Sequence, residues 1–182
     1  MCEVKIRYFT IADYEEEEIW LREQHKKGLR LEKIYLPCFY VFAECPPEDV
    51  IYRLDYQNRE QTADYMQLFR DYGWEYFTSC NGWLYFRKPA SQVEQENDGE
   101  IFSDRQSKLQ MIQHVIQTRL VPIFVVVFCL LLPNWYNCLF GELSALGWGF
   151  GIFFTIVFLL CLGLLIYCGC KLRRLKNRYK TK

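Results

Sequence analysis

The chain has 182 residues, and its 22 Lys and Arg balance 22 Asp and Glu, so its formal net charge at pH 7 is zero. The charges are unevenly placed: residues 1–90 hold 12 basic against 16 acidic side chains, residues 91–118 hold 2 against 5, and residues 119–182 hold 8 against 1. An acidic first half argues against nucleic acid as the main partner, because phosphate binding requires a basic surface.

The first ten residues alternate polar and apolar side chains and contain no apolar leader, so we expect the N-terminal part to stay in the cytoplasm. Val4, Ile6 and Tyr8 fall on one face of this stretch, and Lys5 and Arg7 fall on the other. The alternation predicts a strand with one face buried.

A helix is expected next, between Asp13, which can cap its first turn, and Gly28, which is a natural left-handed stop. Residues 19–21 supply its apolar side. The acidic run Glu15 to Glu18 crowds the first turn, where the helix dipole favours negative charge. We interpret this run as helix-terminus chemistry on a solvated face rather than as a metal site.

Two β-rich runs follow at residues 29–35 and 39–43, and Pro46-Pro47 then marks a linker, because prolines end strands. Residues 50–57 alternate cleanly and predict another strand. Its two faces are Val50, Tyr52, Leu54 and Tyr56 on one side and Ile51, Arg53, Asp55 and Gln57 on the other.

A second helix is expected from Asn58 to Gly73, because Ala63, Met66 and Phe69 recur at helical spacing. The aromatic runs 74–80 and 83–87 then predict strands. Asn81-Gly82 between them is a strong signal for a two-residue hairpin.

The order β-α-β-β thus occurs twice, at a spacing of about 45 residues. The repeat predicts an α+β domain over residues 1–90, a ferredoxin-like duplication with one antiparallel sheet and both helices on one face. The other face of the sheet would be open.

The open face is the expected binding surface of this cytoplasmic domain. If Leu84 and Phe86 point to the core, it carries Arg7, Arg53, Asp55, Trp83, Tyr85 and Arg87. Arginines and aromatic rings on a sheet face can bind a small anionic ligand, a peptide or another sheet. The alternative is that they form cross-strand pairs and cover a sheet that packs on itself or on a dimer partner.

The most distinctive segments are Trp20-Leu21 with Gly28, Tyr52-Arg53-Leu54-Asp55-Tyr56, Phe69 with Gly73-Trp74-Glu75-Tyr76, and Gly82-Trp83-Leu84-Tyr85-Phe86-Arg87-Lys88-Pro89. Over residues 4–90 they resemble the bacterial family called Domain of Unknown Function 2812. The sequence departs from that family at Leu29, where Trp is more usual. The resemblance implies a soluble domain followed by transmembrane helices. It also implies a link to regulation, because genes of this family often lie beside genes for PadR-like transcription regulators. It implies no activity and no catalytic residues.

The rest of the chain predicts a two-helix transmembrane hairpin. Its parts are an acidic linker at 91–102, an amphipathic juxtamembrane helix at 103–119, transmembrane helices at 120–140 and 146–170, and a basic cytoplasmic tail at 171–182. The juxtamembrane helix could instead pack on the soluble domain. The positive-inside rule places both termini in the cytoplasm of a multi-pass protein of the cell membrane.

Two hypotheses for function follow. The first is a membrane-anchored regulatory or sensing module, not an enzyme, that binds a protein partner or a small anionic ligand. The second is a structural or accessory subunit of a larger membrane complex, or a homo-oligomer, held through Gly147 and Gly151, whose small-xxx-small spacing permits close helix contact. The two histidines are isolated and no two cysteines have Cys-x-x-Cys spacing, so we expect a reducing compartment and neither metal nor cofactor.

Overall fold

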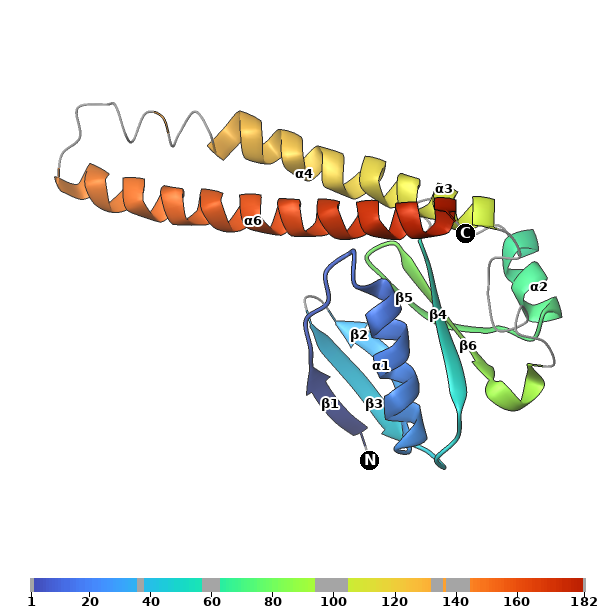
Figure 1. Ribbon diagram of the computed structural model, residues 1–182. Coiled ribbons are helices and arrows are strands. Elements are labelled where there is room, and N and C mark those ends of the chain that lie inside the picture. The colour runs from blue at the N-terminus through green and yellow to red at the C-terminus, as the bar shows by residue number, and fades with distance from the viewer. Residues whose placement is uncertain are drawn as a thin grey trace. The chain divides into compact units, whose positions relative to one another are not determined.

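The fold is that of a computed structural model, which describes residues 2–35, 38–56, 63–93, 105–131, 136 and 145–181. The chain divides into two compact units, residues 1–111 and residues 112–182. Figure 1 shows the helices and strands of each unit.

The first unit contains two three-stranded antiparallel sheets with strand orders β1-β3-β2 and β4-β6-β5. Its elements are β1 (Cys2–Ile6), α1 (Tyr14–Lys26), β2 (Leu29–Tyr35), β3 (Phe39–Glu44), β4 (Val50–Tyr56), α2 (Ala63–Asp71), β5 (Glu75–Cys80), β6 (Trp83–Pro89) and a 3-10 turn at Ala90–Gln92. The order β-α-β-β therefore occurs twice, as the sequence predicts.

The turns form where the sequence places them. Gly28 and Gly73, at the ends of the two helices, have φ angles of +84° and +77°, a left-handed conformation that glycine adopts without strain. Asn81 and Gly82 both have positive φ, as the tight turn of the β5-β6 hairpin requires. These turns fix the length of each element.

Helix α1 packs against strands of both sheets. It contacts β2 of the first sheet and β4 of the second, and Figure 1 shows it between the first sheet and β4. The Arg22 guanidinium on α1 makes hydrogen bonds of 2.6 and 2.8 Å to the Asp49 carboxylate, which precedes β4. These hydrogen bonds, with the nearby Lys26 ammonium, lower the pKa of Asp49 to about 2.

Helix α2 covers the opposite face of the second sheet. Phe69 on α2 stacks on Phe86 of β6, and both belong to a core cluster that also contains Ile51, Trp74 and Leu84. Trp83 and Tyr85, which alternate with these residues along β6, contact α1 instead. Both faces of β6 are therefore buried.

The expected ferredoxin-like arrangement, one sheet with both helices on one face, is not confirmed. Strands β2 and β5 run close to each other, but among the described residues no hydrogen-bonded ladder joins the two sheets. The two helices lie on opposite faces of the β4-β6-β5 sheet. The coarser prediction, a mixed fold of antiparallel sheets and helices followed by apolar helices, is confirmed.

Strand β1 turns its polar face, not its apolar face, toward α1. Lys5 donates a hydrogen bond of 2.7 Å to Gln24 of α1, and the Arg7 guanidinium lies 5.1 Å from the centre of the Trp20 ring. The side chains of Val4 and Ile6 are 57% and 71% exposed on the other face. Lys5 is half-buried by this contact with α1, whereas Glu3 and Arg7 are exposed.

The second unit is helical. Helix α3 (Arg105–Val115) leads into it and continues through a π-helical stretch (Ile116–Leu120), α4 (Val121–Val126) and a second π-helical stretch (Val127–Leu131). Pro122 explains the first π-helical stretch, because proline lacks an N–H and clashes with the carbonyl four residues earlier. Helix α6 (Ala145–Thr181) packs along both π-helical stretches.

Two helical segments among the described residues are long and apolar enough to cross a membrane, by length and composition: Lys108–Cys129 and Thr155–Arg178. They overlap the spans expected at 120–140 and 146–170. The segment between the expected spans falls almost entirely outside the described residues.

Candidate functional site

Helix α1 buries an unusually polar face. Four of its polar side chains, Glu17, Glu18, Gln24 and His25, are each less than a tenth exposed. The prediction that the acidic run forms a solvated face is therefore wrong for two of its members. Glu16 is exposed as expected, but Ile19, assigned to the apolar side, is 61% exposed.

The Glu17 carboxylate joins the two sheets. Its Oε1 atom accepts hydrogen bonds from the Tyr40 hydroxyl of β3, at 2.9 Å, and from the Tyr85 hydroxyl of β6, at 2.8 Å. Burial raises the pKa of Glu17 to about 7, against the opposing effect of the two tyrosine hydrogen bonds and with a small contribution from the Asp13 charge. Glu17 therefore titrates close to neutral pH.

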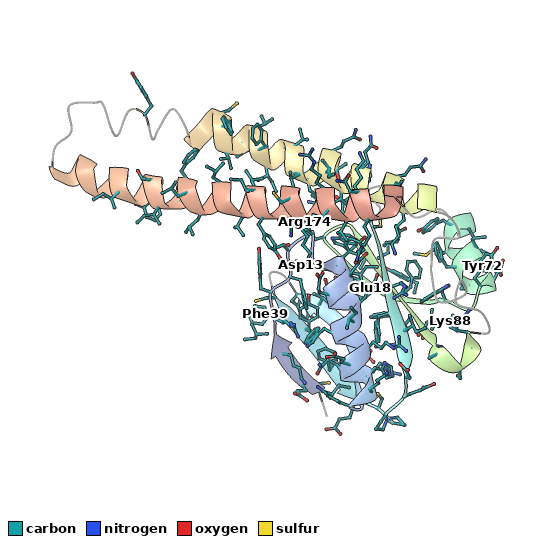
Figure 2. The ribbon with its side chains drawn as sticks, viewed as in Figure 1. Asp13, Glu18, Phe39, Tyr72, Lys88 and Arg174 are labelled. Atoms are coloured by element: carbon teal, nitrogen blue, oxygen red, sulfur yellow. The ribbon has the colours of Figure 1, made fainter. Side chains whose placement is uncertain are left out.

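The neighbouring Glu18 carboxylate binds the free edge of β4. Its Oε1 atom accepts a hydrogen bond of 2.8 Å from the Leu54 backbone N–H, and its Oε2 atom accepts one of 3.2 Å from the Arg53 guanidinium. Figure 2 shows Glu18 on the side of α1 that faces β4. An edge strand whose outward N–H is paired in this way is protected from pairing with another chain.

A second polar connection runs from the second sheet to the end of α1. The Arg87 guanidinium of β6 donates hydrogen bonds of 2.7 Å to each carboxylate oxygen of Glu75 on β5. Arg87 lies opposite Tyr52 of β4 in the sheet register, and the Tyr52 hydroxyl lies 2.7 Å from Nδ1 of His25. The series Glu75, Arg87, Tyr52 and His25, called here the polar relay, thus crosses β5, β6, β4 and α1.

The protonation states in the polar relay follow from burial. Burial raises the pKa of Tyr52 to about 12, although the Arg87 charge opposes this shift, so the hydroxyl keeps its proton. Burial, followed by the Arg87 charge, lowers the pKa of His25, so the imidazole is neutral at pH 7. The two neutral side chains share one hydrogen bond, between the Tyr52 hydroxyl and Nδ1 of His25.

A pocket of about 230 Å³ lies beside the polar relay. It is lined by His25, Arg30, Cys45, Pro46, Glu48, Val50, Glu75, Arg87 and Pro89. These residues come from the end of α1, the starts of β2, β4 and β5, the end of β6 and the linker before β4. Two arginines and a neutral histidine thus meet two glutamates around a space of small-molecule size.

The predicted open face does not form. In the antiparallel register Arg53 lies opposite Phe86 and Asp55 opposite Leu84, on the α2 side of the sheet. The other three predicted residues of this sheet, Trp83, Tyr85 and Arg87, lie opposite Tyr56, Leu54 and Tyr52 on the α1 side. Both sides are covered, which leaves Trp83 6% exposed, Tyr85 4% exposed and Asp55 3% exposed.

The remaining predicted residues are separate from this sheet. Arg7 follows β1 in the first sheet and lies over the rings of Phe9 and Trp20. Arg87 alone among the six predicted face residues lines the pocket. Gly147 and Gly151 fall within α6, but their packing lies outside the part that the structure describes.

Sequence reasoning missed Glu17, His25, Tyr52 and Arg30 as candidate site residues. The sequence did contain a signal for the buried polar face. Glu17, Leu21 and Gln24 recur at helical spacing, so they share one face of the helix with Trp20 and Leu21, the apolar residues expected to be buried. A thirteen-residue helix with so few apolar residues can pack between two sheets only by burying polar ones. Within the described ranges, no three His, Cys, Asp or Glu side chains are grouped to hold a metal ion.

The family model described as "Protein of unknown function (DUF2812)" matches residues 13–126. The chain belongs to this family. The match begins at the N-terminal end of α1 and extends through the second sheet into α4, so it includes every residue of the polar relay and the pocket. No curated protein and no solved structure is significantly similar to the chain.

Proposed function

We propose that this DUF2812 protein is a membrane-attached regulatory or sensing module that binds a small ligand with an anionic group and carries out no catalysis. The observation that carries the proposal is the pocket, where the side chains of His25, Arg30 and Arg87 converge beside the polar relay. The second unit, with its two apolar helices, would supply the membrane attachment.

The charges of the pocket define the ligand class. Guanidinium groups such as those of Arg30 and Arg87 suit carboxylate or phosphate oxygens, and the neutral His25 imidazole adds a hydrogen-bonding group. Glu48 and Glu75 also line the pocket, and their negative charges would repel a ligand that carries two negative charges and no positive one. The pocket therefore favours a ligand that carries an amine as well as an acid group, such as a free amino acid, over a dicarboxylate.

The size of the pocket supports a small metabolite. Its volume of about 230 Å³ lies below the range of roughly 300–1,000 Å³ that is usual for drug-sized ligands. Ligand binding would change contacts outside the pocket, because Arg87 also bonds Glu75 and the Leu31 carbonyl of β2. A ligand that draws Arg87 away from Glu75 breaks a side-chain pair between β5 and β6.

The membrane topology of the proposal rests on charge. Seven Lys and Arg lie between residues 171 and 182, whereas Glu142 is the single charged residue between 120 and 170. The positive-inside rule then places both termini, and with them the pocket, in the cytoplasm. The alternative of an accessory subunit depends on Gly147 and Gly151 and stays a prediction from the sequence.

The test is ligand-dependent thermal stability of the full-length protein in detergent. A panel of amino acids, dicarboxylates and inorganic phosphate is added at millimolar concentration, and the unfolding midpoint is measured. We expect at least one amphoteric ligand to raise the midpoint, because a ligand that binds only the folded state stabilises it by mass action. Dicarboxylates should raise it less.

Two variants of β2 make the test specific. Arg30→Gln removes a pocket cation and should abolish the shift, while Lys33→Gln removes an exposed charge of the same strand outside the pocket and should leave the shift intact. Equal shifts in both variants, or no shift with any member of the panel, would contradict the proposal.

A further inference from the structure

The free edge of β1 is the basis of a further inference, which is independent of the pocket. β1 lies at the end of the strand order β1-β3-β2, and no strand among the described residues pairs with its other side. Unlike the edge of β4, which Glu18 protects, the β1 edge has neither a proline nor a bulge in its ladder.

The register decides which backbone groups point to the free edge. The Arg7 N–H donates to the Cys38 carbonyl at 3.0 Å, and Arg7 and Cys38 continue the β1-β3 register. Hydrogen-bonded and non-hydrogen-bonded pairs alternate in an antiparallel ladder, so Lys5 and Glu3 also bond β3. The N–H and C=O groups of the intervening residues Cys2, Val4 and Ile6 therefore point away from β3, toward the free edge.

The sequence of β1 is self-complementary about Val4. It reads apolar, acidic, apolar, basic, apolar from Cys2 to Ile6. A two-fold axis through Val4 would place Glu3 opposite Lys5 of a second copy, and Cys2 opposite Ile6 of that copy. Both charged pairs are attractive, and such cross-strand pairs stabilise an antiparallel ladder.

The same register satisfies the backbone. With Val4 opposite its own copy, the outward groups of Cys2, Val4 and Ile6 meet those of the second strand and form a continuous ladder. A register centred on Lys5 would also pair outward groups, those of Val4 with those of Ile6 of the second copy, but it places two lysines opposite each other, which is repulsive. Charge therefore favours the register centred on Val4.

We propose that the partner of this edge is a second copy of the chain, paired antiparallel through β1 in the register centred on Val4. The result is a six-stranded sheet of order β2-β3-β1-β1-β3-β2 with two-fold symmetry. The exposed side chains of Val4 and Ile6 then meet those of the second copy on the outer face, which reduces their contact with water.

Charge reversal tests the proposal on the full-length protein in detergent, with the molar mass measured by light scattering across a concentration series. Glu3→Lys and Lys5→Glu each replace two attractive pairs with two repulsive ones, so each should raise the dimer dissociation constant about tenfold or more. The double variant E3K/K5E restores opposite charges and should restore the dimer.

The remaining outcomes overturn the proposal. They are a wild-type protein that stays monomeric across the series, single variants that dimerise as well as the wild type, and a double variant that dimerises no better than the singles. Thermal unfolding of each variant shows that it is folded. Val4→Pro is a second probe, because it removes an N–H from the free edge without removing a bond to β3, and it should also give monomers.

Discussion

The Oε1 atom of Glu17 accepts hydrogen bonds from two tyrosine hydroxyls that belong to different sheets. Three buried polar side chains thus meet at one point between the two halves of the first unit. Burial raises the pKa of Tyr40 and Tyr85 far above neutrality, so both hydroxyls remain donors. The carboxyl group of Glu17, in contrast, changes its protonation within the physiological range of pH.

The first prediction concerns Glu17→Gln. The pKa of Glu17 is about 7 in the folded protein, against an ordinary value of 4.5 in the unfolded chain, so protonation favours folding. Stability is therefore lost as the pH rises from about 4.5 to 7, and it stays reduced above that range. An amide at this position does not ionise, so Glu17→Gln should stabilise the protein at pH 8, by up to about 3 kcal/mol, and have little effect at pH 5.

Unfolding by denaturant at pH 5 and pH 8 measures this difference, and Glu16→Gln is the matched control. Glu16 is the exposed neighbour on the same helix, so its substitution should change stability little at either pH. Equal effects of Glu17→Gln at both pH values would show that Glu17 does not titrate in this range.

At the scale of elements, Gly28 and Gly73 each end a helix, but the space around the two glycines differs. Both end a helix with positive φ. A Cβ atom on Gly28 would lie 2.9 Å from the Cys45 backbone oxygen, whereas one on Gly73 would lie 3.5 Å from the flexible side chain of Lys88. The turn after α1 is therefore the tighter one.

The second prediction is that Gly28→Ala costs more stability than Gly73→Ala. Each substitution places a Cβ in the left-handed region, which costs about 1–2 kcal/mol. Gly28→Ala adds a clash with backbone that cannot move aside by rotation, so its total cost should exceed that of Gly73→Ala by about 1 kcal/mol or more. Urea unfolding of the two variants gives the comparison, and an equal or reversed order would contradict the geometry of this turn.

The elements of the first unit could be predicted from sequence because their signals are local. Gly28, Gly73 and Asn81-Gly82 mark turns whose backbone needs particular residues, and alternation marks the strands between them. The faces of β1 and β6 could not be predicted. Which side of a strand is buried depends on what packs there, and sequence alone did not show that α1 and α2 cover opposite sides of the second sheet.

The candidate site was harder to predict for the same reason. Arg87 was identified, but the hydrogen-bonded pair beside it, His25 and Tyr52, comes from positions 27 residues apart in the chain. The sheet register sets Arg87 opposite Tyr52, and the packing of α1 on β4 then brings His25 to the same place. Neither relation leaves a local pattern in the sequence.

At the scale of the whole molecule, the proposal combines a pocket in the first unit with apolar helices in the second. Cys45 can report both on ligand binding and on the side of the membrane where the pocket lies, because it lines the pocket and is half-buried. Cys38 is also half-buried but does not line the pocket, so it serves as an internal control.

The decisive measurement is the labelling rate of Cys45 by a membrane-impermeant maleimide, read by peptide mass spectrometry on sealed membrane vesicles. In inside-out vesicles Cys45 should be labelled, and an amphoteric ligand that raises the unfolding midpoint should slow that labelling several-fold while Cys38 is unaffected. In right-side-out vesicles both cysteines should stay unlabelled. Labelling of Cys45 in right-side-out vesicles, or a rate in inside-out vesicles that the ligand leaves unchanged, would contradict a ligand pocket on the cytoplasmic side of the membrane.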